Sequence, residues 1–433
     1  MASCSVRTMN LGILRERNFR FFWLAETISS VGNPFTELAL PLTAVILLQA
    51  SAFQVGLLRV MEYLPFVLLG LGAGVVVDRS RPAPLLIGSD LGRMVILLSV
   101  PIAFFSGHLS IAQLYIVAFA AGILTLLQGV AQQAATRALV ERDRLIEANS
   151  KIGMSEEAAG VVGPGVAGLL IGATSAPVAI LVDAVSFGLS AVLVWRIRWR
   201  AEMRARAQAV EPFLRQIREG LAFIVHHRVL LPLATSISTL RFFSSMFVAV
   251  ELVYFVRVLH LSPTTIGLVF AALGLGGVSG AAAAGWLGRR FGVGWTITAG
   301  FAPVGTLLIP LAPASAPIPW LVVGGFLGAF SVVASNVSQL GLRQSMTPRR
   351  LQGRMTASMR FVIMAPAPVG AFLGGTLGTF AGLRFTLWVG ALGALLAAVP
   401  LLLSPMPGIR EIAASAAEAD DATANGLHLP GQP

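Results

Sequence analysis

Residues 178–194 read VAILVDAVSFGLSAVLV, an apolar stretch in which Asp183 is the single charge. A helix of about 20 such residues spans the hydrocarbon core of a bilayer. The rest of the chain has a similar composition, since 56% of its 433 residues are hydrophobic and 12% are charged. Soluble domains carry about twice that share of charge, roughly 25%. The composition therefore excludes an ordinary soluble protein and predicts an integral membrane protein.

Stretches of spanning length occur twelve times, six on each side of a polar segment. They are 19–48, 53–77, 85–105, 113–134, 150–172 and 178–194, then 230–256, 264–287, 295–311, 320–340, 355–378 and 384–403. No alternating strand pattern of about ten residues recurs, so helices rather than a barrel must satisfy the backbone inside lipid. We predict an all-α membrane protein with twelve transmembrane helices.

The two sets of six stretches are related to each other. A shift of 211 residues aligns Ser51–Leu57 with Ser262–Leu268. This repeat predicts two pseudo-symmetric six-helix halves, residues 1–194 and 230–404. Transporters built from repeated halves bind substrate between them, near the bilayer midplane.

Two segments lie outside the halves. Residues 195–229 are rich in arginine and predict a cytoplasmic basic linker with a short amphipathic helix at the membrane surface. The last residues, 405–433, are polar and low in apolar content, and they predict a disordered cytoplasmic tail.

Basic residues mark the side of the membrane that each loop occupies. If the N-terminus is inside, 25 of the 31 lysines and arginines fall in inner segments, whereas the outer loops hold only Arg257 and Arg384. This asymmetry predicts that both termini are cytoplasmic. The formal net charge of +11 then records orientation and contact with anionic membrane lipids, not binding of nucleic acid.

Two motifs carry a resemblance to a known family. The end of the second span reads Gly70-Leu-Gly-Ala-Gly-Val-Val-Val-Asp78-Arg79-Ser-Arg81, which resembles the Gly-x-x-x-Asp-Arg-x-x-Arg loop of the major facilitator superfamily. The fifth span contains Gly160-Val-Val-Gly163-Pro164-Gly165-Val-Ala-Gly168, which is similar to the antiporter motif of that superfamily. With other similar runs along the chain, the sequence resembles the drug:proton antiporters that include macrolide exporters and the enterobactin exporter.

The first motif implies a gate at the inner end of the second span, formed by Gly74, Asp78 and Arg79. Asp78 can accept hydrogen bonds from a helix N-terminus, and Arg79 can pair with acids of the next inner loop. We expect Asp90 and Arg93 to lie near the inner surface and to brace this gate.

The second motif implies export. Its glycines Gly160, Gly163 and Gly168 let helices approach closely, and Pro164 bends the helix. Helix packing alone is an alternative explanation, because small residues are common in membrane helices.

Charged residues inside the spans are expensive and mark candidate proton-coupling sites. At 100° per residue, Glu26, Asn33 and Glu37 share one face of the first span. Arg241 lies deep in the seventh span, so we expect Glu37 or Glu26 to pair with it. Glu62 is three residues from Arg59 on the second span, and we expect the two to neutralise each other.

A wide amphipathic substrate cavity is expected between the halves. Its predicted lining residues are Asn33, Thr125, Gln128, Met246 and Asn336. Two of them mark departures from the resemblance, since Asn33 and Thr125 stand where many drug antiporters carry an acid and an arginine.

These observations predict proton-coupled efflux of hydrophobic or amphiphilic small molecules (drugs, macrolide-like compounds, siderophores or secondary metabolites) by a monomer in a bacterial cell membrane. No Walker loop or metal-ligand spacing occurs, and the single cysteine is Cys4, so no cofactor is implied. An uptake or facilitative carrier with the same fold remains an alternative. A membrane-embedded enzyme or sensor would need clustered carboxylates or a soluble domain, and the sequence shows neither.

Overall fold

The structure is a computed structural model that describes residues 12–70, 81–199, 221–347 and 352–411. These residues form helices and connecting loops, without a strand in the described ranges. Gly74, Asp78 and Arg79 of the predicted gate lie outside the described residues, as do 200–220 of the linker and 412–433 of the tail.

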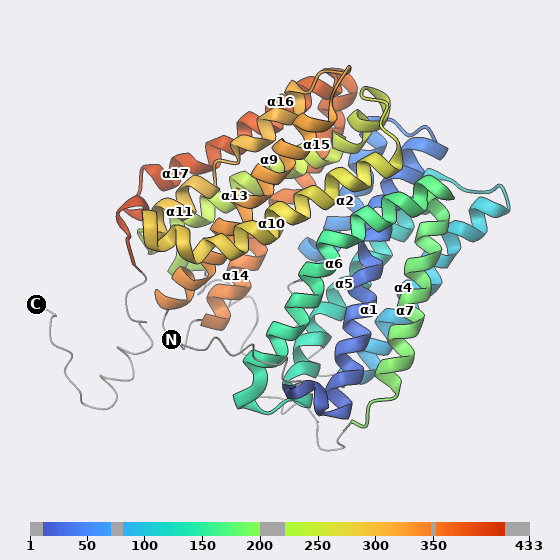
Figure 1. Ribbon diagram of the computed structural model, residues 1–433, viewed down its shortest axis with the longest axis horizontal. Helices are drawn as coiled ribbons and strands as arrows, with labels where there is room; N and C mark the ends of the chain where they lie inside the picture. Colours follow the sequence, from blue (N-terminus) through green and yellow to red (C-terminus); the bar gives the residue numbers. More distant parts are fainter. Residues whose placement is uncertain (1–11, 71–80, 200–220, 348–351, 412–433) are drawn as a thin grey trace, which may run out of the picture.

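The N-terminal half contains six long helices (Figure 1). They are α1 (Arg17–Leu42), which continues as a π-helix (Thr43–Leu47), α2 (Ala52–Leu68), α4 (Pro82–Phe105), α5 (Ile111–Leu139), α6 (Leu145–Ala173) and α7 (Ala176–Trp195).

The C-terminal half repeats this arrangement with more breaks. Its elements are α9 (Leu230–Arg257), α10 (Pro263–Phe291), α11 (Val293–Gly300) with α12 (Leu308–Leu311), α13 (Ile318–Ser345), α14 (Gln352–Met364) with α15 (Pro366–Phe380), and α16 (Leu383–Leu395) with α17 (Val399–Leu402). Two breaks coincide with proline, which lacks the N–H that a helix interior requires: Pro303 follows α11, and Pro366 begins α15.

Ten helical segments of the described chain are long and apolar enough to cross a membrane. The two others of the predicted twelve are α2, which has 17 residues, and α6, whose first half carries several charges. The predicted count of twelve spans fits this arrangement, and the all-helical membrane fold is confirmed.

The aligned repeat begins a helix in each half. Ser51 caps α2, since its hydroxyl accepts a hydrogen bond from the Gln54 amide at 3.3 Å. Ser262 caps α10 in the same way, from the Thr265 amide at 3.2 Å. Serine is a preferred N-cap because its side chain satisfies an amide that the helix leaves free.

The two halves meet along α2 with α15 and along α6 with α10. Glycine permits both contacts: a Cβ on Gly56 would lie 2.6 Å from the Cα of Gly375, and a Cβ on Gly168 would lie 2.6 Å from the Cα of Gly267. The 211-residue shift places Gly56 on Gly267, so the two glycine seams are pseudo-symmetric. The halves converge at this end and diverge toward the end where α1 begins (Figure 1).

Hydrogen bonds reinforce the closed end. The Arg257 guanidinium donates to the carbonyl oxygen of Ala50 at 2.8 Å, and the Phe53 amide donates to the Thr379 hydroxyl at 2.9 Å. Both bonds join one half to the other. They lie at the ends of α2 and α9 that we predict to face the outside.

The predicted start of the disordered tail, at residue 405, is too early in the sequence. Met406 is fully buried in an apolar cluster. The Gly294 amide donates to the carbonyl oxygen of Ile409 at 2.8 Å, and the Val293 amide donates to that of Arg410 at 3.2 Å. Residues 405–411 are therefore held against the start of α11, because an apolar side chain and two backbone hydrogen bonds anchor them.

The described end of the linker also packs on protein. Residues 221–226 are helical, and Ile224 is buried against Leu230, Ala234, Met355 and Met359. This part of the predicted amphipathic helix therefore buries one apolar residue in the C-terminal half instead of in the membrane surface.

Candidate functional site

A cavity of about 530 Å³ lies between the halves. Most of its lining comes from the N-terminal half, from α1, α2, α4, α5, α6 and α7. The C-terminal half contributes Val248, Glu251 and Leu252 from α9 with Phe270 and Leu273 from α10. The predicted position between the halves is thus correct, but the lining is strongly asymmetric.

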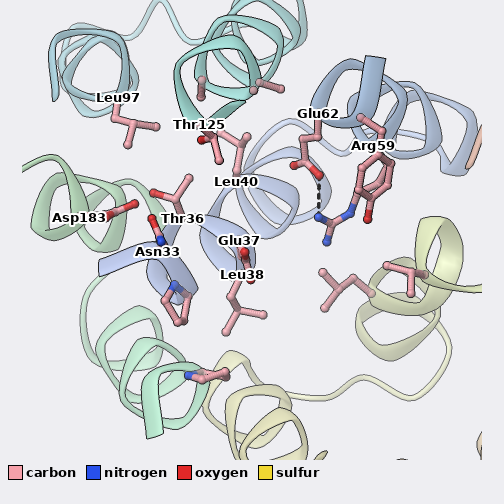
Figure 2. Close-up of a pocket in the computed structure, with 18 of the residues that line it drawn as sticks. Asn33, Thr36, Glu37, Leu38, Leu40, Arg59, Glu62, Leu97, Thr125 and Asp183 are labelled. Carbon is pink, nitrogen blue, oxygen red and sulfur yellow. Dashed lines mark hydrogen bonds and ion pairs between the residues drawn. The ribbon is translucent and has the colours of Figure 1, made fainter. Parts of the chain in front are cut away.

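Helix α1 presents one polar face to the cavity (Figure 2). Asn33, Thr36, Glu37 and Leu40 all line it, as the helical period of 3.6 residues requires for positions three and four apart. Glu37 is exposed within the cavity. The face predicted from Asn33 and Glu37 therefore does open into the cavity.

Helix α2 contributes an ion pair to the wall. The Arg59 Nη1 lies 2.7 Å from the Glu62 Oε2, which confirms the predicted pairing. Figure 2 shows this pair on one side of Glu37. Arg59 lines the same cavity as Glu37 and Glu251, and its Nε has no hydrogen-bond partner in the described part of the protein.

Asp183 on α7 lies on the opposite side of α1, facing Thr36 (Figure 2). Its side chain is buried and accepts a hydrogen bond from the Ser186 hydroxyl at 3.2 Å. Gly32 makes this possible, since a Cβ there would lie 2.3 Å from the Asp183 Oδ1 and 2.2 Å from the Ser186 Oγ. Close packing of α1 on α7 therefore positions this carboxylate beside the cavity.

Asp90 and Arg93 form a buried pair between α4 and α7. Their side chains approach to 2.7 Å, the Ser190 hydroxyl donates to Asp90 at 2.7 Å, and the Arg93 guanidinium lies 3.9 Å from the centroid of the Phe187 ring. Asp90 lies about 12 Å along α4 from its start and is fully buried. The pair therefore joins α4 to α7 through the Ser190 hydroxyl and the Phe187 ring, and its position near the inner surface and its role in bracing the gate stay predictions.

Glu26 is not in the cavity. It is 5% exposed and accepts a hydrogen bond from the Gln128 amide at 3.5 Å, between α1 and α5. Gln128 is also buried, so this predicted cavity residue instead supports Glu26.

Arg241 does not form the predicted pair with Glu37 or Glu26. Its guanidinium carbon lies 5.1 Å from the centroid of the Tyr63 ring of α2, and no ion pair joins it to a carboxylate of the described chain. Because α9 packs on α2 rather than on the cavity face of α1, an aromatic ring occupies the place expected for an acid.

Of the other predicted lining residues, two line the cavity and two do not. Asn33 and Thr125 line the cavity. Met246 is buried beside Gly374 of α15, and Asn336 is exposed on α13, where it accepts a hydrogen bond from Gln339. Periodicity alone did not show that α13 lies outside this cavity.

The antiporter motif positions α6 against two neighbours. A Cβ on Gly163 would lie 2.6 Å from the Cγ of Pro34 in α1. Gly168 meets Gly267 of α10, whereas a Cβ on Gly160 would meet nothing within 4 Å. Pro164 lines the cavity. The motif therefore joins the cavity wall to the contact between halves.

Glu251 is the functional candidate that sequence reasoning missed. It is not among the residues predicted above, yet it lines the cavity and is 5% exposed. The repeat contained the signal: Glu37 precedes the capping Ser51 by 14 residues, and Glu251 precedes the capping Ser262 by 11. Positions that differ by three residues lie on nearly the same helix face.

The start of α6 lies outside the predicted span and is hydrogen-bonded to a residue near the N-terminus. The Ile13 amide donates to Glu147 at 2.9 Å. Arg144 contacts both Glu147 and Glu16. The bond from Ile13, together with Arg144, holds the pKa of Glu147 below its usual range.

A resident metal is not indicated by the described residues, which contain no group of three or more His, Cys, Asp or Glu placed to hold one. The cavity instead combines four carboxylates (Glu37, Glu62, Asp183, Glu251) and two arginines with aromatic and aliphatic walls. Such a site can hold a proton or a small amphiphilic molecule.

Known proteins with similar sequences are transporters. The family described as transmembrane secretion effector matches residues 8–426. The multidrug efflux pump Tap of Mycolicibacterium fortuitum is 26% identical over 417 residues, which cover 90% of this chain and 95% of that protein. Macrolide efflux protein A of Streptococcus pyogenes is 24% identical over 267 residues, which cover 60% of this chain and 65% of that protein.

Solved structures share the fold at low sequence identity. A bacterial homologue of the iron transporter ferroportin in an inward-facing state has a TM-score of 0.70 and 17% identity, and the match covers 89% of this chain and 98% of that chain. A bacterial homologue of the human lysosomal transporter Spinster, inward-facing and occupied, has a TM-score of 0.72 and 12% identity, with coverage of 97% and 99%.

Proposed function

The chain belongs to the transmembrane secretion effector family of the major facilitator superfamily, and from this premise we propose that it exports hydrophobic or amphiphilic small molecules in exchange for protons. The observation that carries the proposal is Glu37, a carboxylate exposed in a membrane-embedded cavity with mostly apolar walls. It is a multi-pass membrane transporter, not an enzyme. Two relatives are named as multidrug and macrolide efflux proteins, which supports drug-like substrates.

The two halves supply the moving parts. Contacts between them concentrate at the glycine seams, while the bundles diverge at the end where α1 begins (Figure 1). With the predicted topology, this is a conformation open to the cytoplasm. Opening the seams and closing the other end would expose the cavity to the outside, which is alternating access by rocking.

Glu37 is the proposed proton carrier. A carboxylate in the membrane is costly when ionised, so protonation and deprotonation change the stability of each conformation. The ion pair of Arg59 with Glu62 stands beside it, and Glu62 is assigned to the same charge network. Glu26, buried beside Gln128, is proposed as a second proton site.

The energetics permit coupling to a single proton. One charge that moves through about 150 mV releases about 3.5 kcal/mol. For a substrate without net charge, that free energy maintains a several-hundred-fold concentration gradient, because each 1.4 kcal/mol corresponds to about tenfold.

The membrane location, the orientation and the oligomeric state are also proposed, on the basis of the sequence. We assign the transporter to a bacterial cell membrane, with both termini in the cytoplasm, in contact with anionic lipids and active as a monomer. Its substrates are proposed to be drugs, macrolide-like compounds, siderophores or secondary metabolites.

Inside-out membrane vesicles with an acidic lumen test this function. A protein that exchanges protons for substrate will accumulate at least one of ethidium, a macrolide and a siderophore in the lumen, and a protonophore will abolish the uptake. Glu37→Gln will abolish proton-driven accumulation, whereas Glu157→Gln, which removes an exposed carboxylate of α6, will preserve it.

The same assay can contradict the proposal. If Glu37→Gln and Glu26→Gln each transport like the wild type, the coupling assignment is wrong. If accumulation requires the opposite proton gradient, the protein is an uptake carrier.

A further inference from the structure

Glu251 lies in the cavity without a bonded partner. It is 5% exposed, and its neighbours along α9, Val250 and Leu252, are buried apolar residues. No hydrogen bond or ion pair to its carboxylate occurs within the described ranges. A carboxylate in such surroundings requires a positive charge or a proton, because its desolvation is not otherwise offset.

The arginines of the cavity do not supply that charge in full. Arg93 is engaged by Asp90 at 2.7 Å and by the Phe187 ring. Arg59 is engaged by Glu62 at 2.7 Å, and it lines the same cavity as Glu37 and Glu251. This guanidinium therefore lies in one cavity with three carboxylates, and two of them, Glu37 and Glu251, form no ion pair within the described residues.

Two other described arginines on or beside α9 make contacts of their own. Arg241 stacks on Tyr63. Arg384 of α16 donates to the carbonyl oxygens of Pro310 and Ala312, each at 2.8 Å. Helix α15, which packs on α9, contains no charged residue. The cavity thus has more carboxylates than guanidinium groups, and Glu251 is the buried acid among them that has no hydrogen bond or ion pair within the described residues.

The walls near Glu251 define the chemistry of a suitable ligand. Phe66 and Phe270 line the cavity together with aliphatic residues, whereas the Tyr63 ring is already covered by the Arg241 guanidinium. Aromatic faces attract organic cations, whereas a bare metal ion requires several oxygen or nitrogen ligands. A volume of about 530 Å³ falls within the range of sites for drug-sized ligands.

We propose that Glu251 binds the charged group of a lipophilic organic cation, and that Arg59 competes with this cation for the Glu251 carboxylate. The inference rests on the proposed export function and narrows its substrate class. It also assigns a role to the C-terminal half, which otherwise contributes only apolar lining residues to the cavity.

Binding of tetraphenylphosphonium to the purified full-length protein in detergent tests the proposal, with neutral triphenylphosphine oxide as the matched ligand. Glu251→Gln will weaken binding of the cation by about tenfold or more, the ratio expected from loss of one charged contact. Binding of the neutral ligand will change by less than about twofold. Glu251→Asp will retain most of the cation affinity, and Glu157→Gln will retain all of it.

Arg59→Gln is expected to change the affinity for the cation in the opposite direction. Removing the competing guanidinium will raise the affinity for tetraphenylphosphonium severalfold. The thermal unfolding midpoint and elution volume of each variant identify any that fails to fold, and Glu251→Asp then decides the role of the charge.

Three results would overturn the inference: a wild-type protein that does not bind tetraphenylphosphonium, a Glu251→Gln variant that binds it unchanged, or an equal loss of both ligands. Binding of the cation that depends on Glu251, found together with an absence of proton-driven transport, would contradict the proposed function and support this inference.

Discussion

Helices α2 and α10 begin alike and then differ where they reach the cavity. Both start at a capping serine, and both use a glycine five residues later, Gly56 or Gly267, to touch the opposite half. Three residues further along, the 211-residue shift places Arg59 on Phe270, and it places Glu62 on Leu273. All four line the cavity.

This difference separates two requirements of a transporter. The seam between halves needs close backbone approach on both sides of the pseudo-symmetry axis, so glycine occurs in both copies. The chemistry of the cavity needs an ion pair only once. The N-terminal half therefore holds most of the charge, and the C-terminal half provides an apolar wall with the single carboxylate of Glu251.

The strongest test makes α2 resemble α10. The double substitution Arg59→Phe with Glu62→Leu removes both members of the ion pair together, so neither partner is left as a buried charge without the other, and the protein should fold. Proton-driven efflux in inside-out vesicles should fall by about 100-fold or more, equivalent to roughly 3 kcal/mol.

The matched control removes a pair with the same spacing outside the cavity. Arg144 and Glu147 are three residues apart and form a partly exposed pair at 3.2 Å. Arg144→Gln with Glu147→Gln should leave transport nearly unchanged. Equal losses in the two double variants would show that the comparison of α2 with α10 has no functional meaning.

A smaller and symmetric effect is expected at the glycine seams. Gly56→Ala and Gly267→Ala each place a Cβ about 2.6 Å from backbone atoms of the other half. Such overpacking costs about 1–3 kcal/mol, so each variant should destabilise the conformation in which the seams are closed and slow transport by roughly tenfold.

The accessibility of single cysteines introduced into the cavity would report a shift toward the conformation in which the seams are open. Gly88→Ala is the control, because a Cβ there meets nothing within 4 Å. If only one of the two seam variants has an effect, the seams are not equivalent.

The smallest effect concerns the inner ends of the halves. In the N-terminal half the Glu147 side chain holds the Ile13 amide, while in the C-terminal half backbone groups of Ile409 and Arg410 bind the start of α11. The pKa of Glu147 is lowered, so its contribution to stability is present above its ordinary value of 4.5 and is lost as pH falls through the lowered pKa.

Glu147→Gln should therefore lower the thermal unfolding midpoint slightly at pH 7 and have no effect in strongly acidic buffer. Differential scanning calorimetry at both values measures this. A shift of the same size at both values would contradict the ionic origin of the effect.

The amino-acid sequence alone determined the membrane fold, the repeat and the charged positions within spans. It did so because hydrophobic length, helical period and the cost of burying charge are local properties. The pairing of Arg59 with Glu62 and the shared face of Asn33 and Glu37 belong to this class, since each involves residues on one helix.

Contacts between helices were decided only by the tertiary structure. The sequence could not show that Tyr63 would meet Arg241, that Ser190 would bind Asp90, or that Glu251 would face the same cavity as Glu37. These facts depend on how the helices rotate and pack against one another. Packing follows from glycine seams and side-chain shapes across the whole molecule, which one helix does not contain.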